Sequence, residues 1–86
     1  MYKIEYAKQI EQCVKKIPKK DRIAILQKIE LLAIDPRPQG LKMLRGKQGR
    51  CYRIRAGDYR IIYHIEDKIV TVYIIKIAHR KTVYND

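Results

Sequence analysis

The sequence predicts an α+β fold for residues 1–86, a single domain in which a two-helix hairpin packs on one face of a mostly antiparallel four-stranded sheet. Apolar residues recur at helical spacing in two neighbouring segments and alternate with a period of two farther along the chain. The expected element order is β-α-α-β-β-β. Because a chain of 86 residues has little else with which to bury a sheet, the helices must cover one face and leave the other open.

The N-terminal part of the chain is expected to hold one strand and both helices. Tyr2 to Tyr6 alternates and predicts a short strand. From Ala7, apolar residues keep helical spacing up to Pro18, which ends the first helix or opens the second. Lys19 to Ile34 is the second helix, with Asp21 near its start, where a carboxylate suits the helix dipole. The expected inner stripe of this helix is Ile25, Leu26, Ile29, Leu32 and Ala33.

The rest of the chain is expected to form a loop, a β-hairpin and a last strand. Two prolines and a glycine in residues 35–40 cannot continue a helix. Leu41 to Gly49 is mixed in pattern, and its two later glycines indicate turns. Cys51 to Tyr63 alternates on both sides of Gly57-Asp58, which is typical of a β-hairpin. Lys68 to Ala78 is the last strand.

The alternation of the hairpin places its basic residues together. Arg53 and Arg55 are two positions apart, so their side chains leave the same face. Arg60 can share that face if the register allows, while Ile54 and Ile61 point to the opposite one. Three Arg with no acid among them indicate a bound anion, because guanidinium groups match phosphate oxygens two at a time.

The end of the last strand supplies a second set of polar residues. His79 and Arg80 follow that strand directly, and Tyr84 lies a few positions farther on. If the last strand pairs with the hairpin, this segment lies near the open face. It would then add a guanidinium, an imidazole and a phenol to the Arg cluster.

The charge of the chain narrows the class of partner. Twenty Lys and Arg against nine Asp and Glu give a net charge of +11, which indicates a polyanion: nucleic acid, an acidic protein or an anionic membrane. A membrane is the weakest of these, since the apolar runs are far shorter than a spanning helix. Cys13 and Cys51 form no zinc or Cys-x-x-Cys pattern and predict reduced thiols in a cytoplasmic protein. We expect neither a metal nor another cofactor.

Several segments of the chain, in order, resemble the RelE-type toxins of the RelE/ParE superfamily, which belong to bacterial and archaeal toxin–antitoxin pairs. The resemblance covers almost the whole length and implies a RelE-like fold. The segments that carry it are the helical hairpin, residues 35–38 (Asp-Pro-Arg-Pro), residues 42–46 (Lys-Met-Leu-Arg-Gly), residues 51–55 (Cys-Tyr-Arg-Ile-Arg), residues 57–63 (Gly-Asp-Tyr-Arg-Ile-Ile-Tyr), and His79-Arg80 followed by Val83-Tyr84.

The resemblance implies a metal-independent endoribonuclease that cuts mRNA in the ribosomal A site. The 2′-hydroxyl of the RNA attacks the adjacent phosphorus, and the 5′-oxygen leaves. This reaction needs a group that takes the 2′ proton, cations for the charge on the phosphoryl oxygens, and a proton for the leaving oxygen. By the resemblance, these roles fall on Arg53, Arg55, Arg60, Arg80 and Tyr84.

The identity of the general base is left open between two residues. The best-studied family pattern has Lys at the positions of Arg53 and Arg55. Arg has a reference pKa of roughly 12.5 or more and cannot accept a proton at neutral pH. His79 is the local alternative because imidazole titrates near neutrality. Tyr84 is the other, provided that neighbouring cations lower its pKa from about 10.

By the resemblance, the expected partners are mRNA, the ribosome and a cognate acidic, RelB-like antitoxin, through which alone the chain would contact operator DNA. The candidate RNA-binding residues outside the catalytic set are Lys42, Arg45, Lys47 and Arg50. Two other functions stay open. A ParE-type toxin would inhibit DNA gyrase without cutting RNA, and an inactive member of the fold would act only together with its antitoxin.

Overall fold

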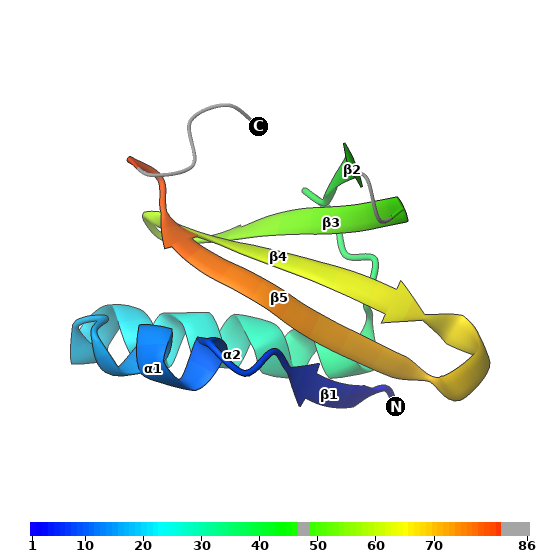
Figure 1. Ribbon diagram of the computed structural model, residues 1–86, viewed down its shortest axis with the longest axis horizontal. Coiled ribbons are helices and arrows are strands. Elements are labelled where there is room, and N and C mark those ends of the chain that lie inside the picture. The colour runs from blue at the N-terminus through cyan, green and yellow to red at the C-terminus, as the bar shows by residue number, and fades with distance from the viewer. Residues whose placement is uncertain (47–48, 82–86) are drawn as a thin grey trace.

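The computed structural model describes residues 1–46 and 49–81, which form one sheet with two helices on one side of it (Figure 1). The sheet has five strands in the order β1-β5-β4-β3-β2. Only the β1–β5 pair is parallel, and the other three pairs are antiparallel. The α+β class, the helical hairpin and the open face are therefore as predicted.

The first elements follow the local sequence signals closely. Strand β1 spans Lys3–Tyr6, helix α1 spans Ile10–Lys15, and helix α2 spans Lys19–Ile34. Pro18 directly precedes α2, where its fixed φ and missing N–H are tolerated. The inner stripe of α2 is narrower than predicted, because Leu26 is 38% exposed.

The strand count is the main correction to the predicted fold. The mixed segment before the hairpin forms a fifth strand, β2 (Lys42–Gly46), which pairs antiparallel with β3 (Gly49–Ala56) and begins where Lys42 lies opposite Arg53. Its two glycines suggested turns, and five residues show too little alternation to identify a strand. Pairing with the longer β3 supplies the backbone hydrogen bonds that the local sequence does not predict.

The hairpin connects β3 to β4 (Tyr59–Glu66) through a two-residue turn, Gly57-Asp58. Gly57 has a φ of 63°, a value that suits glycine at the first central position of such turns. A short 3-10 helix (Asp67–Ile69) then leads into β5 (Thr71–His79). The β4–β5 register shifts between Ile62 and Tyr63, because Ile62 lies opposite Lys76 and Tyr63 lies opposite Ile74. The alternation of β5 side chains between the two faces of the sheet is interrupted at this point.

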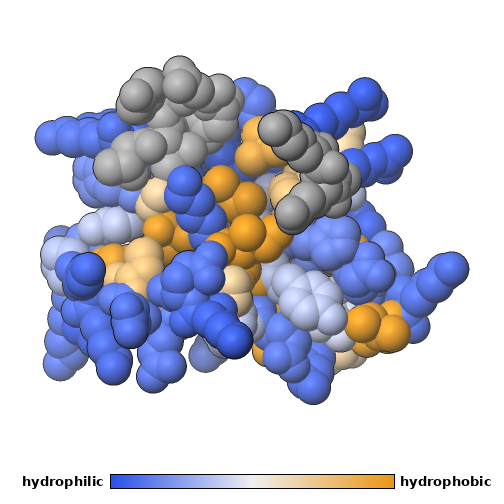
Figure 2. All heavy atoms as spheres, viewed as in Figure 1, coloured by the Kyte–Doolittle hydropathy of each residue, from blue (hydrophilic) through white to orange (hydrophobic). Residues whose placement is uncertain are grey.

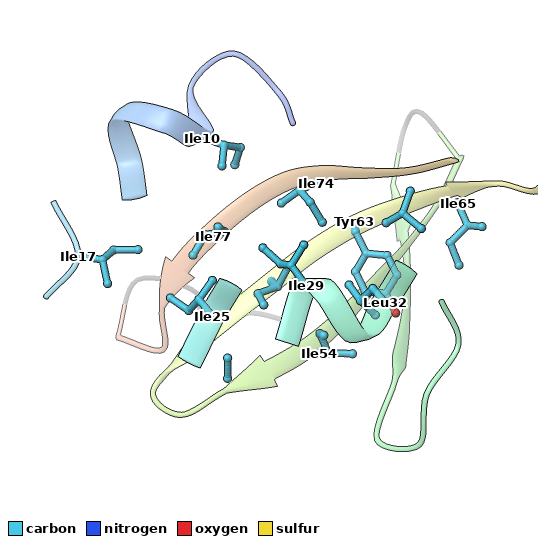
Figure 3. Close-up of a cluster of buried hydrophobic side chains, with 13 residues drawn as sticks. Ile10, Ile17, Ile25, Ile29, Leu32, Ile54, Tyr63, Ile65, Ile74 and Ile77 are labelled. Carbon is cyan, nitrogen blue, oxygen red and sulfur yellow. The ribbon is translucent and has the colours of Figure 1, made fainter. Parts of the chain in front are cut away.

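The core lies between the helices and one face of the sheet (Figure 3). Ile25, Ile29 and Leu32 of α2 are almost fully buried, and they pack with the hairpin residues Ile54 and Ile61. These are the apolar positions that alternate with the Arg residues in the sequence. The burial of one face therefore fixes which face of the hairpin carries the charges.

Two interactions fasten the loop after α2 to the far end of the sheet. The Tyr63 hydroxyl, which is fully buried, donates a hydrogen bond of 2.8 Å to the Pro36 carbonyl oxygen. The Arg37 guanidinium donates to both carboxylate oxygens of Asp67, at 3.2 and 2.8 Å. The Tyr2 hydroxyl donates to the same carboxylate at 2.7 Å. These polar contacts hold the end of the sheet that lies away from the Gly57-Asp58 turn.

Candidate functional site

Like charges face each other directly across the β3–β4 hairpin. Arg55 lies opposite Arg60, and on the other side of β3 Lys42 lies opposite Arg53. By alternation these four residues share the open face. Like charges placed directly opposite in a sheet are destabilising, so the arrangement costs stability and is suited to holding an anion. The predicted sharing of a face by Arg53, Arg55 and Arg60 agrees with this register.

A hollow of about 160 Å³ lies at the turn end of the hairpin, and we call it the end hollow. Arg55, Arg60 and Arg80 line it, together with the turn residues and Tyr59. Arg80 reaches it because its backbone N–H donates to the Asp58 carbonyl oxygen at 2.8 Å, and its Nε lies 3.7 Å from the Asp58 carboxylate. The tertiary fold thus joins Arg80 to the hairpin pair.

Arg53 has a different environment from the other three predicted Arg. Its side chain is only 7% exposed, whereas Arg55 and Arg80 are exposed. It lies opposite Ile62 of β4 and faces a separate cleft at the edge of β3. Arg53 is therefore near the end hollow in the sequence but does not line it.

By register the His79 side chain leaves the sheet on the face opposite to Arg60, and His79 does not line the end hollow, although its neighbour Tyr59 does. His79 is opposite Tyr59, and the two rings meet edge to face with centroids 5.2 Å apart. Tyr59 and His79 each lie two positions from a core residue, Ile61 and Ile77 respectively, and so share the face of those residues. His79 also lines a groove beside Cys13 of α1. Its Nδ1 accepts a hydrogen bond of 3.2 Å from the Lys81 backbone N–H. The expectation that its imidazole would join the Arg cluster is not met.

The remaining predicted residues are divided between two faces. Lys42 lies on the open face opposite Arg53, whereas Arg45 and Arg50 lie opposite each other on the other face of the β2–β3 pair. All three are exposed. Lys47 and Tyr84 lie outside the described residues.

A histidine on the open face forms a second polar cluster. His64 places Nδ1 3.1 Å from the Arg50 carbonyl oxygen and Nε2 2.8 Å from Glu66 Oε1, and its ring stacks on Tyr73. The hydrogen bond to the Arg50 carbonyl, assisted by Glu66, raises the pKa of His64, although partial burial opposes this. His64 therefore interacts with residues of both neighbouring strands and is not part of the Arg cluster.

Two residues near the site were not identified from the sequence. Asp58 positions Arg80, and Lys28 of α2 reaches the edge cleft beside Arg53. Asp58 looked only like a turn residue, and Lys28 only like a polar position on a helix. Their proximity to the Arg residues depends on the β4–β5 register and on helix packing, for which the sequence carries no local signal.

The face of the molecule seen in Figure 2 has an apolar centre within a hydrophilic surround. Figure 2 shows apolar surface over the middle of β4 and β5, with hydrophilic side chains around it.

In residues 1–46 and 49–81, no group of three or more His, Cys, Asp or Glu side chains could hold a metal ion. Over those residues, neither helix is long and apolar enough to cross a membrane.

A protein-family model matches nearly the whole chain. The family model described as the ParE toxin of the type II toxin–antitoxin system parDE matches residues 4–84. A curated relative, toxin RelG of Mycobacterium tuberculosis, is 37% identical over 43 residues, which make up 50% of this chain and 49% of that toxin. The matched segment thus spans about half the length of that relative.

Solved structures with the same fold extend the similarity. The Pyrococcus horikoshii RelE–RelB complex matches with a TM-score of 0.81 and 29% identity over 92% of this chain and 94% of that one. The toxin–antitoxin complex RelBE2 of Mycobacterium tuberculosis matches at 0.78 and 26%, over 92% and 98%. The isolated E. coli RelE toxin matches at 0.77 and 25%, over 92% and 84%.

Proposed function

Because the chain belongs to the RelE/ParE superfamily of type II toxin–antitoxin toxins, we propose that it is a toxin that cleaves mRNA on the ribosome. The observation that carries this proposal is the end hollow. It brings together three guanidinium groups, from Arg55, Arg60 and Arg80, at a cost in like-charge repulsion between the hairpin pair. A surface that only required solubility would gain nothing from that arrangement.

The proposed chemistry is transfer of the phosphoryl group to the 2′-oxygen of the same RNA strand. The 2′-hydroxyl gives up its proton and bonds to phosphorus, the bond from phosphorus to the 5′-oxygen breaks, and the 5′-oxygen takes up a proton. Arg55, Arg60 and Arg80 stabilise the negative charge that builds up on the phosphoryl oxygens. Each such donor is typically worth about 10²–10³ in rate. Arg also delivers this charge without titrating near neutrality, so charge stabilisation is constant across physiological pH.

Proton transfer needs a group other than the guanidinium groups of the end hollow. Arg55 and Arg60 cannot accept the 2′ proton at neutral pH. The His79 side chain leaves the sheet on the face opposite to Arg60, and His79 does not line the end hollow. Tyr84 remains the proposed base on the ground of family resemblance. Replacing Tyr84 with Phe should then abolish the rise of kcat with pH, whereas His79→Gln should leave that rise in place.

The proposed partner is an acidic antitoxin related to RelB. The similar structures from P. horikoshii and M. tuberculosis are complexes of a toxin with its antitoxin. A net charge of +11 makes loose binding to RNA and ribosomes unavoidable at low salt, so an inhibitor must compete for the same cations. We propose that acidic side chains of the antitoxin cover Arg55, Arg60 and Arg80, and that operator DNA is contacted through the antitoxin.

A second function is kept because of one comparison. The matching family model is described as the ParE toxin. As stated in the sequence analysis, a ParE-type toxin would inhibit DNA gyrase without cutting RNA. One experiment separates the two functions. The purified protein is added to a reconstituted translation reaction and, in parallel, to a gyrase supercoiling assay. Cleavage of ribosome-bound mRNA with unaffected supercoiling supports the nuclease, and inhibited supercoiling with intact mRNA contradicts it.

A further inference from the structure

A cleft of about 500 Å³ lies beside the end hollow, at the edge of the sheet where β2 stops pairing with β3, and we call it the edge cleft. Its walls come from three elements and a loop. Lys28 projects from α2, Lys42 begins β2, and Arg53 and Arg55 belong to β3, while Gly40 lies in the loop before β2. The edge cleft therefore connects the helix side of the sheet to its open face.

The charge of the edge cleft has one sign. Its described lining contains four cationic side chains and no carboxylate, whereas the end hollow includes Asp58. Lys42 and Arg53 are also directly opposite each other in the β2–β3 register. Gathering like charges in one concave site raises the local potential and attracts an anion.

Two of the lining residues shape the edge cleft, Arg53 by its burial and Gly40 by its backbone conformation. Arg53 is 93% buried, at 7% exposure, so its guanidinium cannot move freely as a solvated side chain would. Gly40 has a φ of 86°, and a Cβ at that position would meet no atom within 4 Å. Glycine is required there by the backbone conformation, and it leaves the rim of the cleft uncrowded. A preorganised guanidinium and an open rim are suited to binding a ligand.

We propose that the edge cleft binds a second phosphate of the RNA strand whose reacting phosphate occupies the end hollow, with Lys28 as a binding residue. Arg55 lines both sites, so a single strand can pass from one to the other along the edge of β3. The inference rests on the proposed function in taking RNA as the polyanion. A protein segment is a poorer fit, since Leu41 and Ile54 are the only large apolar residues in the described lining, and protein interfaces depend on apolar anchors.

The test is a binding measurement on the free protein with an RNA that cannot be cleaved. A fluorescent 2′-O-methyl oligoribonucleotide of about ten nucleotides is titrated at a series of salt concentrations. Lys28→Gln is compared with Lys20→Gln, which removes the same charge from an exposed position on the same helix. The slope of log K against log salt should be shallower by about 0.7 in Lys28→Gln than in Lys20→Gln. Lys28→Arg should retain the wild-type slope.

Equal slopes in the two Gln variants would overturn the proposal, because the cleft would then contribute only net charge. An acidic peptide that depends on Lys28 more strongly than the oligonucleotide does would also overturn it and assign the cleft to a protein partner. Cleavage of ribosome-bound mRNA is measured separately. A wild type that fails to cleave, together with the Lys28-specific slope, would refute the nuclease and leave the phosphate site standing.

Discussion

Replacing Arg55 with Gln should make the protein more stable and less active at the same time. Arg55 is exposed and lies directly opposite Arg60 in the hairpin. A like-charged cross-strand pair costs about 0.2–1 kcal/mol, so removing one member should raise the free energy of unfolding by that amount. For a domain of this size, the melting temperature should rise by roughly 1–8 °C. The gain should shrink in high salt, since exposed charges are screened.

The same substitution should slow cleavage of ribosome-bound mRNA. Arg55 lines the end hollow, and the loss of one preorganised donor typically lowers kcat by about 10²–10³. The assay is single-turnover cleavage of mRNA in stalled ribosomes at saturating toxin, read by primer extension. Saturation separates the effect on the chemical step from weaker binding of a protein that has lost one positive charge.

Lys76→Gln is the matched control for this prediction. Lys76 is exposed on the same face but lies opposite Ile62 and does not line the end hollow. Its loss should change stability by no more than about 0.5 kcal/mol and leave the saturated rate unchanged. If Arg55→Gln is folded and cleaves at the wild-type rate, the end hollow does not hold the reacting phosphate. If it is less stable than the wild type, the argument from like-charge repulsion is wrong.

Three further predictions concern stability. Tyr63→Phe removes the buried 2.8 Å hydrogen bond to Pro36 and should lower the free energy of unfolding by about 1–2 kcal/mol, measured from urea midpoints; an unchanged midpoint would contradict it. The hydrogen bond from Arg37 lowers the pKa of Asp67 to about 2, so its ionised form stabilises the fold above pH ~4. The advantage of the wild type over Asp67→Asn should therefore disappear as the pH falls from about 4 to 2, and a constant difference in melting temperature would refute this. The pKa of His64 is raised, so its contribution is complete below about pH 6.5 and is lost as the pH rises through the folded value; His64→Gln should show no such loss in melting scans across that range.

Much of the fold could be predicted from the sequence, because the signals concerned are local. Helix α2 spans Lys19–Ile34 as predicted, since helical spacing runs through it and Pro18 precedes it. The alternation of Ile54 with Arg53 and Arg55 also identified the two faces of the hairpin before any partner strand was known. Burial of the apolar set then leaves the Arg set on the other face.

The pairing of β2 and the assembly of the site could not be predicted in the same way. Strand β2 is too short to show a period, and it is defined by its register with β3. Lys28 comes close to Arg53 only because α2 packs across the sheet to its edge. These are contacts between segments distant in sequence, so no window of the sequence contains both partners.

The sequence by itself determined that this chain has a basic sheet face, where that face lies on the hairpin, and which family the chain resembles. Only the tertiary structure decided which residues at the end of β5 join that face. The β4–β5 register puts His79 opposite Tyr59 on the helix side and brings Arg80 to Asp58 beside the Arg pair. The physical reason is the period of two in a strand: a shift of one residue in register moves every side chain to the opposite face, and register is fixed by the partner strand.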